Sequence, residues 1–426
     1  MIVDQLKLNR WIGLILTICV GEGAWHVLRM LAAFILIHWL TKDQYATFTL
    51  ILAIKGTAGV LLDLGFTGGL TALIGKRCHE PETVGRYVFA AKFFRDRLIA
   101  VGVFGLLIAF YFAAERFDWN SMFALQIWVI VSASIYFESR YAILSPILKL
   151  QQRLKEAFYI NLSAAISRLV LLVVLYFTGM LTVSAVILAS LIETVVSVVG
   201  IRRQTTHDFL PPRKSDRLKV EKKEALDLTL PKIPGVVFYA LQGQITIFLI
   251  STLGSYEEIA SLGALNKISL LFMLPTSFIG MLILPWYSKL DHKHLLSGVS
   301  MVMMAYCAFG FALVTLNYLF PEVFLILLGD SYGSLKYEIF LYSILAVLNL
   351  ISFLLYALSA SRKWVYYWTG ASTIVASLGA LVMFAVISDL SQLTTVIYLS
   401  IATSIATLLI NLAVFIVGYT RSKAAS

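Results

Sequence analysis

Long apolar runs separated by short polar turns follow one another along almost the whole chain. An α-helix of ~20 apolar residues crosses the hydrocarbon core of a bilayer. Runs of about this length predict twelve membrane helices, at 12–38, 46–74, 98–113, 121–147, 158–177, 182–200, 232–253, 259–287, 298–319, 338–360, 365–387 and 393–418. The stretch 321–335 leaves room for one more short helix at the membrane interface. The pattern is that of an all-α polytopic membrane protein.

Composition supports this class, because 59% hydrophobic residues, 14% charged residues and a mean hydropathy of +0.85 exclude a soluble globular domain. No cleaved signal peptide is expected, since the N-terminus leads into a long run with internal charges and not into a short apolar core with a cleavage site. Cys19, Cys78 and Cys307 are scattered and give neither a metal-ligand spacing nor a disulfide framework. We therefore expect no metal and no other cofactor.

The basic residues predict the orientation of the helices. With twelve spans, 26 of the 34 Lys and Arg residues fall in the termini and loops on one side, and only Lys42, Arg116 and Lys336 fall on the other. Basic loops stay in the cytoplasm, so both termini of this multi-pass protein are expected there. The net charge of +10 then reflects attraction to an anionic leaflet. Nucleic-acid binding is not needed to explain it.

The basic, Pro-containing segment 201–231 lies near the middle of the chain and predicts a cytoplasmic linker. It would join an N-terminal six-helix lobe, residues 1–200, to a C-terminal six-helix lobe, residues 232–426. A weak internal similarity at an offset of 214 residues relates Phe34–Lys55 to Phe248–Ser269. Because six spans intervene, such halves would be parallel repeats about an axis along the membrane normal.

The first predicted span carries charges in its middle. Glu22, His26 and Arg29 fall within about 60° of one another around a helix, so they share one face. A charge at bilayer depth costs ~2.5–3.5 kcal/mol on insertion scales and persists where it faces a bundle interior, a watery cavity or a counter-charge. Two interpretations stay open here: an internal salt-bridge network, or a substrate or ion pathway.

The second span contains Lys55 and Asp63, which lie about 80° apart around the helix and can line one cavity at different depths. Gly65 and Gly69 follow with the small-xxx-small spacing that allows close helix approach. Packing is the simpler interpretation for the two glycines.

Further polar residues are spread over spans four to eight. In span four, Glu138 and Arg140 lie about 200° apart and cannot share a face, and Arg140 either snorkels or lines a cavity. In span five, Asn161 and Arg168 form a second polar stripe. Later polar or helix-breaking positions are Glu193, Gln242, Gln244, Asn266, Lys267, Pro275 and Pro285.

These residues predict a cavity of mixed sign inside the bundle. Guanidinium and ammonium groups pair with phosphate or carboxylate, so the basic members suit an anionic head group. The candidate substrate-binding residues are Arg29, Lys55, Arg168, Lys267, Arg140, Asn161 and Gln242. The acids and the histidine could titrate during transport, so the candidate ion-coupling residues are Glu22, His26, Asp63, Glu138 and Glu193.

Common catalytic motifs are absent from the sequence. It contains no G-x-x-x-x-G-K-[ST] phosphate loop, no G-x-S-x-G and no H-E-x-x-H. The predicted outer loops are also short, so we expect a transporter and no enzyme.

Two phrases of the sequence resemble the polysaccharide flippases of the MATE-like exporter superfamily, the Wzx-type O-antigen transporters. The first is HWLTKDQYATFTLILAIKGTAGVLLDLGFTGGLTALIGKR, with an acidic turn near a Tyr and the element Asp63-Leu64-Gly65. The second contains Leu274-Pro275 and Leu284-Pro285, as in the family's eighth helix. The resemblance extends over nearly the whole chain but is diffuse, and Ala46 stands where the family usually has Gly.

The resemblance implies a protein of the bacterial inner membrane with a V-shaped pair of six-helix lobes. The lobes would alternate access and move an oligosaccharide on undecaprenyl pyrophosphate to the outer leaflet. Partners would be this lipid-linked substrate, membrane lipids and, in an assembly complex, a polysaccharide polymerase and chain-length proteins. One alternative is a multidrug antiporter of the same superfamily, although the predicted spans carry five cations against four anions, and a pump for organic cations favours acids. The others are an integral membrane enzyme of polysaccharide assembly and a structural scaffold.

Overall fold

The computed structural model describes residues 21, 23–210, 218–230, 233–287, 290, 292–362, 364 and 366–425. These residues are almost entirely helical, and no strand occurs among them. The prediction of an all-α polytopic protein is confirmed. Glu22, an expected ion-coupling residue, lies outside the described residues.

Ten described helices are long and apolar enough to cross a membrane. Their bounds are Lys42–Asp63 (α2), Pro81–Arg116 (α4), Ser121–Leu150 (α5), Leu154–Phe177 (α6), Val183–Thr205 (α7), Tyr256–Phe278, His294–Leu319, Lys336–Ser361 (α16), Trp368–Ile387 and Leu393–Ser422. The other two predicted spans correspond to the helix Gly23–Trp39 and to the bent pair α9 (Ile233–Gln242) and α10 (Ile245–Leu253), which meet at 47°.

Shorter helices complete the chain, and several were not expected from the sequence. In the first half they are α3 (Phe66–Ile74), a 3-10 turn (Gly75–Arg77) and α8 (Lys219–Thr229). In the second half, α11 (Tyr256–Ile268) continues through a 3-10 turn (Ser269–Phe272), α12 (Met273–Phe278), a π-helical turn (Ile279–Ile283) and α13 (Leu284–Tyr287). The remaining elements are α14 (His292–Leu319), α15 (Pro321–Leu328), a 3-10 turn (Asp330–Tyr332), α17 (Tyr367–Ile387) and α18 (Leu393–Ala425).

Local sequence explains several helix starts. The Asn120 side chain accepts a hydrogen bond from the backbone N–H of Met122 at the start of α5. Ser255 and Glu258 form a complete capping box at the start of α11. Both arrangements satisfy N–H groups that the first turn of a helix leaves without an intrahelical acceptor.

The chain divides into two compact units. The N-terminal unit holds the described residues of Leu16–Ala32 together with Thr47–Ile245, and the C-terminal unit holds Ala33–Ala46 and Thr246–Ser426. The segment Ala33–Ala46 therefore groups with the second half of the chain. Its contacts explain this, because Lys42 forms a 2.5 Å ion pair with Glu257 and the hydroxyl of Tyr45 donates to a carbonyl of α11. The lobe boundaries predicted from the linker remain a prediction.

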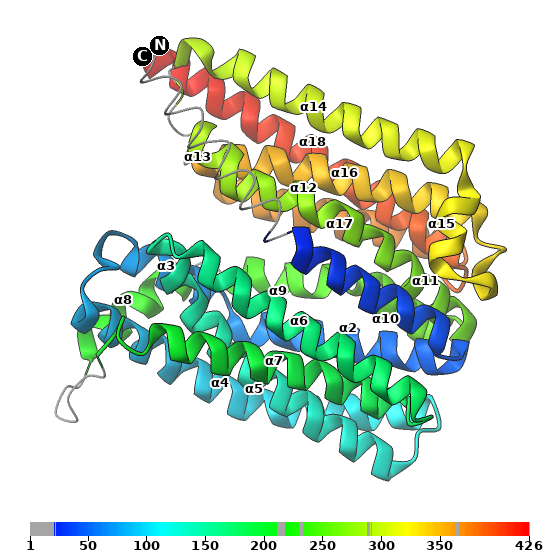
Figure 1. Ribbon diagram of the computed structural model, residues 1–426. Coiled ribbons are helices and arrows are strands. Elements are labelled where there is room, and N and C mark those ends of the chain that lie inside the picture. The colour runs from blue at the N-terminus through cyan, green and yellow to red at the C-terminus, as the bar shows by residue number, and fades with distance from the viewer. Residues whose placement is uncertain are drawn as a thin grey trace, which may run out of the picture. The chain divides into compact units, whose positions relative to one another are not determined.

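In the N-terminal unit, α5 packs on α4 and α7, and α7 packs on α6 (Figure 1). A core of aliphatic side chains from α3 to α7 lies at the end of the unit that carries α8. The predicted span 98–113 is only part of α4, which begins at Pro81. This correction brings Arg95 and Asp96 into a membrane-spanning helix.

At this same end, Arg153 in the turn between α5 and α6 connects three segments. It pairs with Glu156 at 2.5 Å and with Asp208, beyond α7, at 2.7 Å. The hydrogen bond to Glu156 and the nearby charge of Asp208 raise the pKa of Arg153 above its ordinary value. The turn is thereby held to the end of α7.

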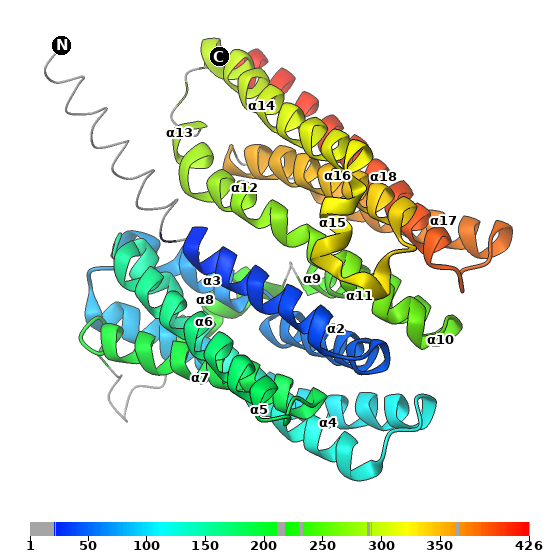
Figure 2. The same cartoon turned by 45° about the vertical axis from the view of Figure 1, so that its right-hand side comes forward.

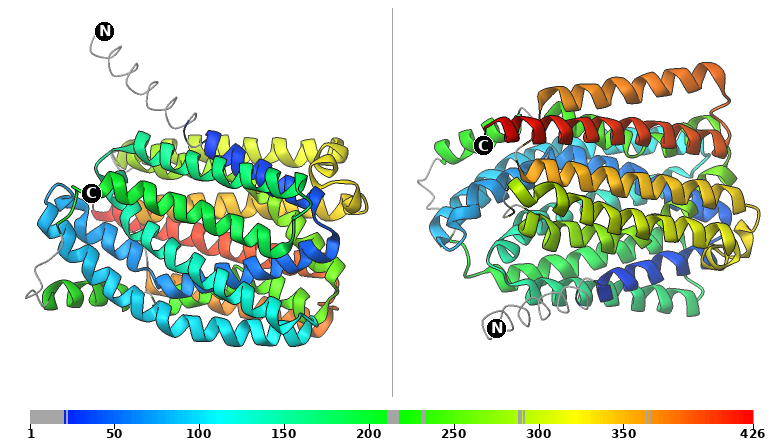
Figure 3. Two further views of the ribbon diagram at one scale, coloured as in Figure 1. Left: turned by 60° about the horizontal axis from the view of Figure 1, so that its bottom comes forward. Right: turned by 90° about the horizontal axis from the view of Figure 1, so that it is seen from above.

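In the C-terminal unit, α14, α16 and α18 lie side by side (Figure 2). Their core includes Phe272, Tyr287, Leu295, Leu354 and Leu358. At one edge, α17 packs mainly on α18 (Figure 3). Most of its apolar side chains stay exposed, as expected for a helix that faces lipid.

Candidate functional site

The second predicted span is broken where the sequence reads Asp63-Leu64-Gly65. Helix α2 ends at Asp63, Leu64 and Gly65 have φ angles of 45° and 85°, and α3 begins at Phe66. Glycine adopts such positive φ angles without steric cost, whereas leucine does so rarely. The break leaves the first N–H groups of α3 without intrahelical acceptors, so this end carries a partial positive charge.

A cavity of about 790 Å³ lies beside this break, inside the N-terminal unit. Residues of α2, α3, α4, α5 and α9 and of the break itself line it. They include two cations, two acids and three glycines. The lining residues are Leu52, Lys55, Gly56, Gly59, Val60, Leu62, Asp63, Gly65, Thr67, Arg95, Ile99, Ile135, Glu138, Ser139, Ala142 and Val236. Lys55 and Asp63 thus line one cavity, as their helical spacing predicts.

The glycines have different structural roles. A Cβ atom added at Gly59 would meet nothing within 4 Å, so this position borders open space. One added at Gly69 would lie 3.2 Å from Oγ1 of Thr229 in α8, which is close packing. The expected packing role therefore fits Gly69, whereas Gly65 permits the helix break.

Two ion pairs cross the cavity wall. Lys55 Nζ lies 2.7 Å from Oε1 of Glu138, and Arg95 Nη1 lies 3.0 Å from Oδ1 of Asp63. Arg95 Nη1 also donates to the Thr67 hydroxyl at 2.8 Å, and that hydroxyl donates to Asp63 at 2.6 Å. The Asp63 carboxylate therefore lies at the positive end of α3 and binds the guanidinium of α4.

Arg95 keeps unused capacity to bind an anion. The residue is only 4% exposed, yet its Nε has no hydrogen-bond partner among the described residues. Ser139, which is 1% exposed, likewise has no partner for its hydroxyl within the described part of the chain. A guanidinium can bind an oxyanion through two N–H groups, so Arg95 could hold an anionic ligand if that ligand displaced Asp63.

A second charged cluster joins the helix Gly23–Trp39 to α6 and α7. Arg168 pairs with Glu193 at 3.0 Å, and Arg29 interacts electrostatically with both. The Arg29 guanidinium also lies 5.0 Å from the ring centre of Trp25, and His26 is buried beside it. These residues are within the N-terminal unit but do not line the 790 Å³ cavity.

The remaining predicted residues are distributed as follows. Arg140 pairs with Asp96 at 2.8 Å, which favours an internal contact over snorkelling. Asn161 accepts a 2.6 Å hydrogen bond from Tyr141. Gln242 is at the end of α9 and is not part of the cavity lining, and Lys267 belongs to α11 of the other unit. Roles of all these residues in binding or coupling remain predictions.

Four residues of these sites were not predicted from the sequence: Arg95, Asp96, Thr67 and Ser139. Arg95 was assigned to a loop because Lys92, Arg95, Asp96 and Arg97 end the apolar run when hydropathy alone is considered. A helix-start signal was available, since Pro81 stands at the first turn of α4 and proline is favoured there. A start at Pro81 would have placed Arg95 inside a helix.

Comparison with solved structures identifies the fold. A MATE protein in complex with MaD3S matches with a TM-score of 0.67 and 15% identity, over 96% of this chain and 94% of that chain. The chain has the MATE fold. An inward-facing multidrug resistance MATE transporter of the MOP superfamily matches with a TM-score of 0.64 and 15% identity, over 94% of this chain and 95% of that chain. A eukaryotic MATE transporter matches with a TM-score of 0.68 and 13% identity, over 95% of both chains.

Sequence comparison adds no closer relationship. No family model matches the chain, and no curated protein matches it either. With identities of 13–15%, the structural similarity establishes the MATE fold alone.

Proposed function

We propose that this protein is a flippase that moves a lipid-linked oligosaccharide from the cytoplasmic to the outer leaflet by alternating access. The MATE fold, shared with known transporters, supports transport over catalysis. The observation that carries the proposal is the anion-binding wall of the 790 Å³ cavity: the N-terminal end of α3, the buried Arg95 and Lys55. A broken membrane helix whose positive end faces a cavity is a recurrent way to bind anionic groups.

The substrate head group in this proposal is a pyrophosphate, as in undecaprenyl-pyrophosphate-linked sugars. In the substrate-free protein, Asp63 and Glu138 neutralise the two cations. A pyrophosphate would compete with these carboxylates for Arg95 and Lys55. Asp63 stays among the predicted ion-coupling residues, because separation of its carboxylate from Arg95 would release the guanidinium for the phosphate.

A multidrug antiporter is the second candidate function. One relative in fold is a multidrug resistance transporter, and the cavity lining holds as many acids as cations. An organic cation would then pair with Asp63 and Glu138 in place of Lys55 and Arg95. The two functions require opposite members of the same ion pairs.

Transport by the purified protein in proteoliposomes tests both functions. The probes are a fluorescent undecaprenyl pyrophosphate linked to N-acetylglucosamine and, separately, ethidium. We expect movement of the lipid and a loss of at least ~10-fold in Arg95→Gln, because a charge-assisted contact contributes about 1.5–3 kcal/mol. Arg97→Gln is the matched control, since Arg97 is an exposed residue of the same helix outside the cavity.

Ethidium transport that depends on Asp63 and Glu138, without movement of the lipid, would replace the flippase proposal by the multidrug one. Complementation extends the test to cells. A strain without its own flippase should regain surface polysaccharide, with the protein in the inner membrane and both termini in the cytoplasm. A polymerase and chain-length proteins are the partners proposed there.

A further inference from the structure

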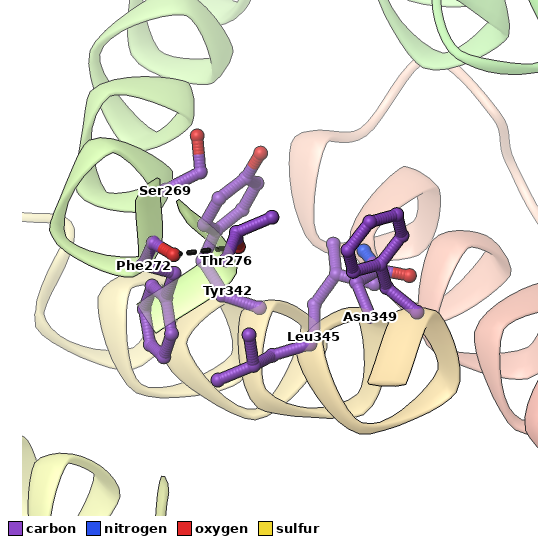
Figure 4. Close-up of a pocket in the computed structure, with 9 residues that line it drawn as sticks. Ser269, Phe272, Thr276, Tyr342, Leu345 and Asn349 are labelled. Carbon is purple, nitrogen blue, oxygen red and sulfur yellow. Dashed lines mark hydrogen bonds between the residues drawn. The ribbon is translucent and has the colours of Figure 1, made fainter. Parts of the chain in front are cut away.

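The C-terminal unit contains a small pocket of about 170 Å³ between the start of the irregular helical segment after α11 and the middle of α16 (Figure 4). Its wall is formed by aromatic, aliphatic and uncharged polar side chains. The lining residues are Ser269, Phe272, Thr276, Tyr342, Leu345, Ala346, Asn349, Leu350 and Phe353. No charged side chain belongs to this lining, in contrast to the cavity of the N-terminal unit.

The backbone beside the pocket departs from regular α-helix. Ser269 and Phe272 are the first and last residues of the 3-10 turn, and Pro275 and the π-helical turn Ile279–Ile283 follow. Such irregular turns within a helix often occur at functional sites. The hydroxyl of Tyr306 also donates to the carbonyl of Pro275 in this segment, at 2.7 Å.

Three hydroxyl groups of the wall already donate their protons to the protein. Ser269 donates to the carbonyl of Asn266 at 2.5 Å, and Thr276 donates to the carbonyl of Phe272 at 2.7 Å. Tyr342 donates to the side-chain oxygen of Asn266. Each hydroxyl oxygen therefore has lone pairs left for a ligand but no proton, and all three act as acceptors.

Asn349 supplies hydrogen-bond donors to the pocket. Its Oδ1 accepts a 2.9 Å hydrogen bond from Ser404 of α18. Within the described residues, its Nδ2 makes no hydrogen bond, so both N–H groups can donate to a ligand. A complementary ligand has several hydroxyl donors, at least one acceptor and no charge.

We propose that this pocket binds one neutral sugar ring. Sugar hydroxyl groups satisfy the three acceptors and Asn349, and the apolar faces of the ring contact Phe272 and Phe353. An organic cation fits less well, because no carboxylate in the lining would neutralise it. The inference rests on the proposed function, in which the sugar belongs to the lipid-linked oligosaccharide, and it adds a carbohydrate subsite to that function.

Binding of simple sugars to the purified full-length protein tests the subsite directly. The protein is placed in nanodiscs, since glycoside detergents would compete for the pocket. Methyl glycosides of glucose, galactose, rhamnose and N-acetylglucosamine are titrated, and the thermal unfolding midpoint is recorded. We expect at least one glycoside to raise the midpoint, and Tyr342→Phe and Asn349→Leu to weaken its apparent affinity roughly 5–10-fold, the effect of one lost hydrogen bond.

Tyr306→Phe is the matched control. It removes a hydroxyl that bonds to the same irregular segment but does not line the pocket, so it should lower the starting midpoint as Tyr342→Phe does and leave glycoside affinity unchanged. Equal affinities in Tyr342→Phe and Tyr306→Phe, or no glycoside that stabilises the wild-type protein, would overturn the subsite.

The proposed function is tested separately from the pocket, by the transport assay. Glycoside binding without movement of the lipid-linked probe would remove the flippase and keep the pocket as a sugar site. Movement of the probe without glycoside binding would keep the flippase and remove the pocket. Stabilisation by ethidium that Tyr342→Phe abolishes would assign the pocket to organic cations and overturn the proposal.

Discussion

The cavity of the N-terminal unit and the pocket of the C-terminal unit occupy equivalent places in the chain. On α5, residues 135, 138, 139 and 142 line the first, and on α16, residues 342, 345, 346 and 349 line the second, each 207 positions later. Lys55 on α2 corresponds to Ser269 at the 214-residue offset of the internal similarity, and α2 and α11 also begin 214 residues apart. The agreement supports a repeat in which the fourth span packs beside the second in one unit, and the tenth packs beside the eighth in the other.

The two places differ in the chemistry of their walls. Where the cavity has the ion pair Lys55–Glu138, the pocket has Ser269 and Leu345. No charged side chain belongs to the pocket lining. A repeat can keep its helix framework while a few lining positions change, because the framework depends on apolar packing and the site on single polar groups. The difference fits a substrate with one charged part and one neutral part, a pyrophosphate and a sugar.

The largest effect is expected when the N-terminal cavity receives the uncharged lining of the C-terminal pocket. In the double variant Lys55→Ser, Glu138→Leu, both charges disappear together, so neither member of this ion pair is left without its partner. We expect transport of the lipid-linked probe to fall more than ~10-fold, since a charged contact to phosphate contributes about 1.5–3 kcal/mol. The measurement is the proteoliposome assay, with protein amount matched by quantitative blot.

The single variant Glu138→Leu is the control for stability. It leaves Lys55 without its carboxylate, and a fully buried ion would cost about 3–5 kcal/mol. The Glu138 side chain is 43% exposed, so we expect a smaller loss, about 1–2 kcal/mol, which the double variant should partly recover. Normal transport by the double variant would show that this ion pair only holds helices together.

How far the sequence predicts these two sites depends on what each one requires. The break at Asp63-Leu64-Gly65 was not predicted, because the apolar run 46–74 indicates one continuous span. The apolar spans and the shared cavity of Lys55 and Asp63 do follow from hydropathy and helical spacing. These features are local, and each is encoded within one helix. They were sufficient to predict the all-α membrane architecture.

Features that depend on two distant segments were not predictable in this way. Arg95 lies in a charged stretch, and only its pairing with Asp63, from another helix, shows why it is buried. The neutral pocket is still harder to see, because Tyr342, Asn349 and Ser269 are ordinary residues of membrane helices. The roles of Tyr342 and Asn349 depend on hydrogen bonds between helices, with Asn266 and with Ser404, which no pattern in one helix reveals.

An intermediate effect on transport is expected when a large side chain fills the N-terminal cavity. Gly59 borders open space in the charged cavity, so Gly59→Phe should fill that space with little change in stability. We expect a several-fold loss of lipid transport and an unchanged affinity for glycosides, since the pocket belongs to the other unit. Thermal unfolding, transport and glycoside titration are measured on the same preparation.

Gly105→Phe provides the control, because a Cβ atom at Gly105 also meets nothing within 4 Å but the residue is exposed on α4. It should leave transport unchanged. If both phenylalanine variants transport equally well, the space beside Gly59 is not on the substrate's route.

The smallest effect is expected at α8, which has a role in supporting α3. Glu221 of α8 is buried and pairs with Arg86 of α4 at 2.5 Å, and Thr229 packs against Gly69 of α3. Glu221→Gln keeps the side-chain volume and removes the charge, so α8 should dock more weakly by about 1 kcal/mol, because Arg86 is partly exposed.

Weaker docking should release α3 slightly and lower transport no more than about 5-fold, the factor that corresponds to 1 kcal/mol. Limited trypsin cleavage at Lys222 and Lys223 reports the docking itself, and it should become faster in Glu221→Gln. Asp227→Asn is the matched control, because Asp227 is an exposed acid of the same helix. Faster cleavage with unchanged transport would show that the positive end of α3 keeps its position without α8, so that the break at Gly65 alone fixes the anion-binding wall.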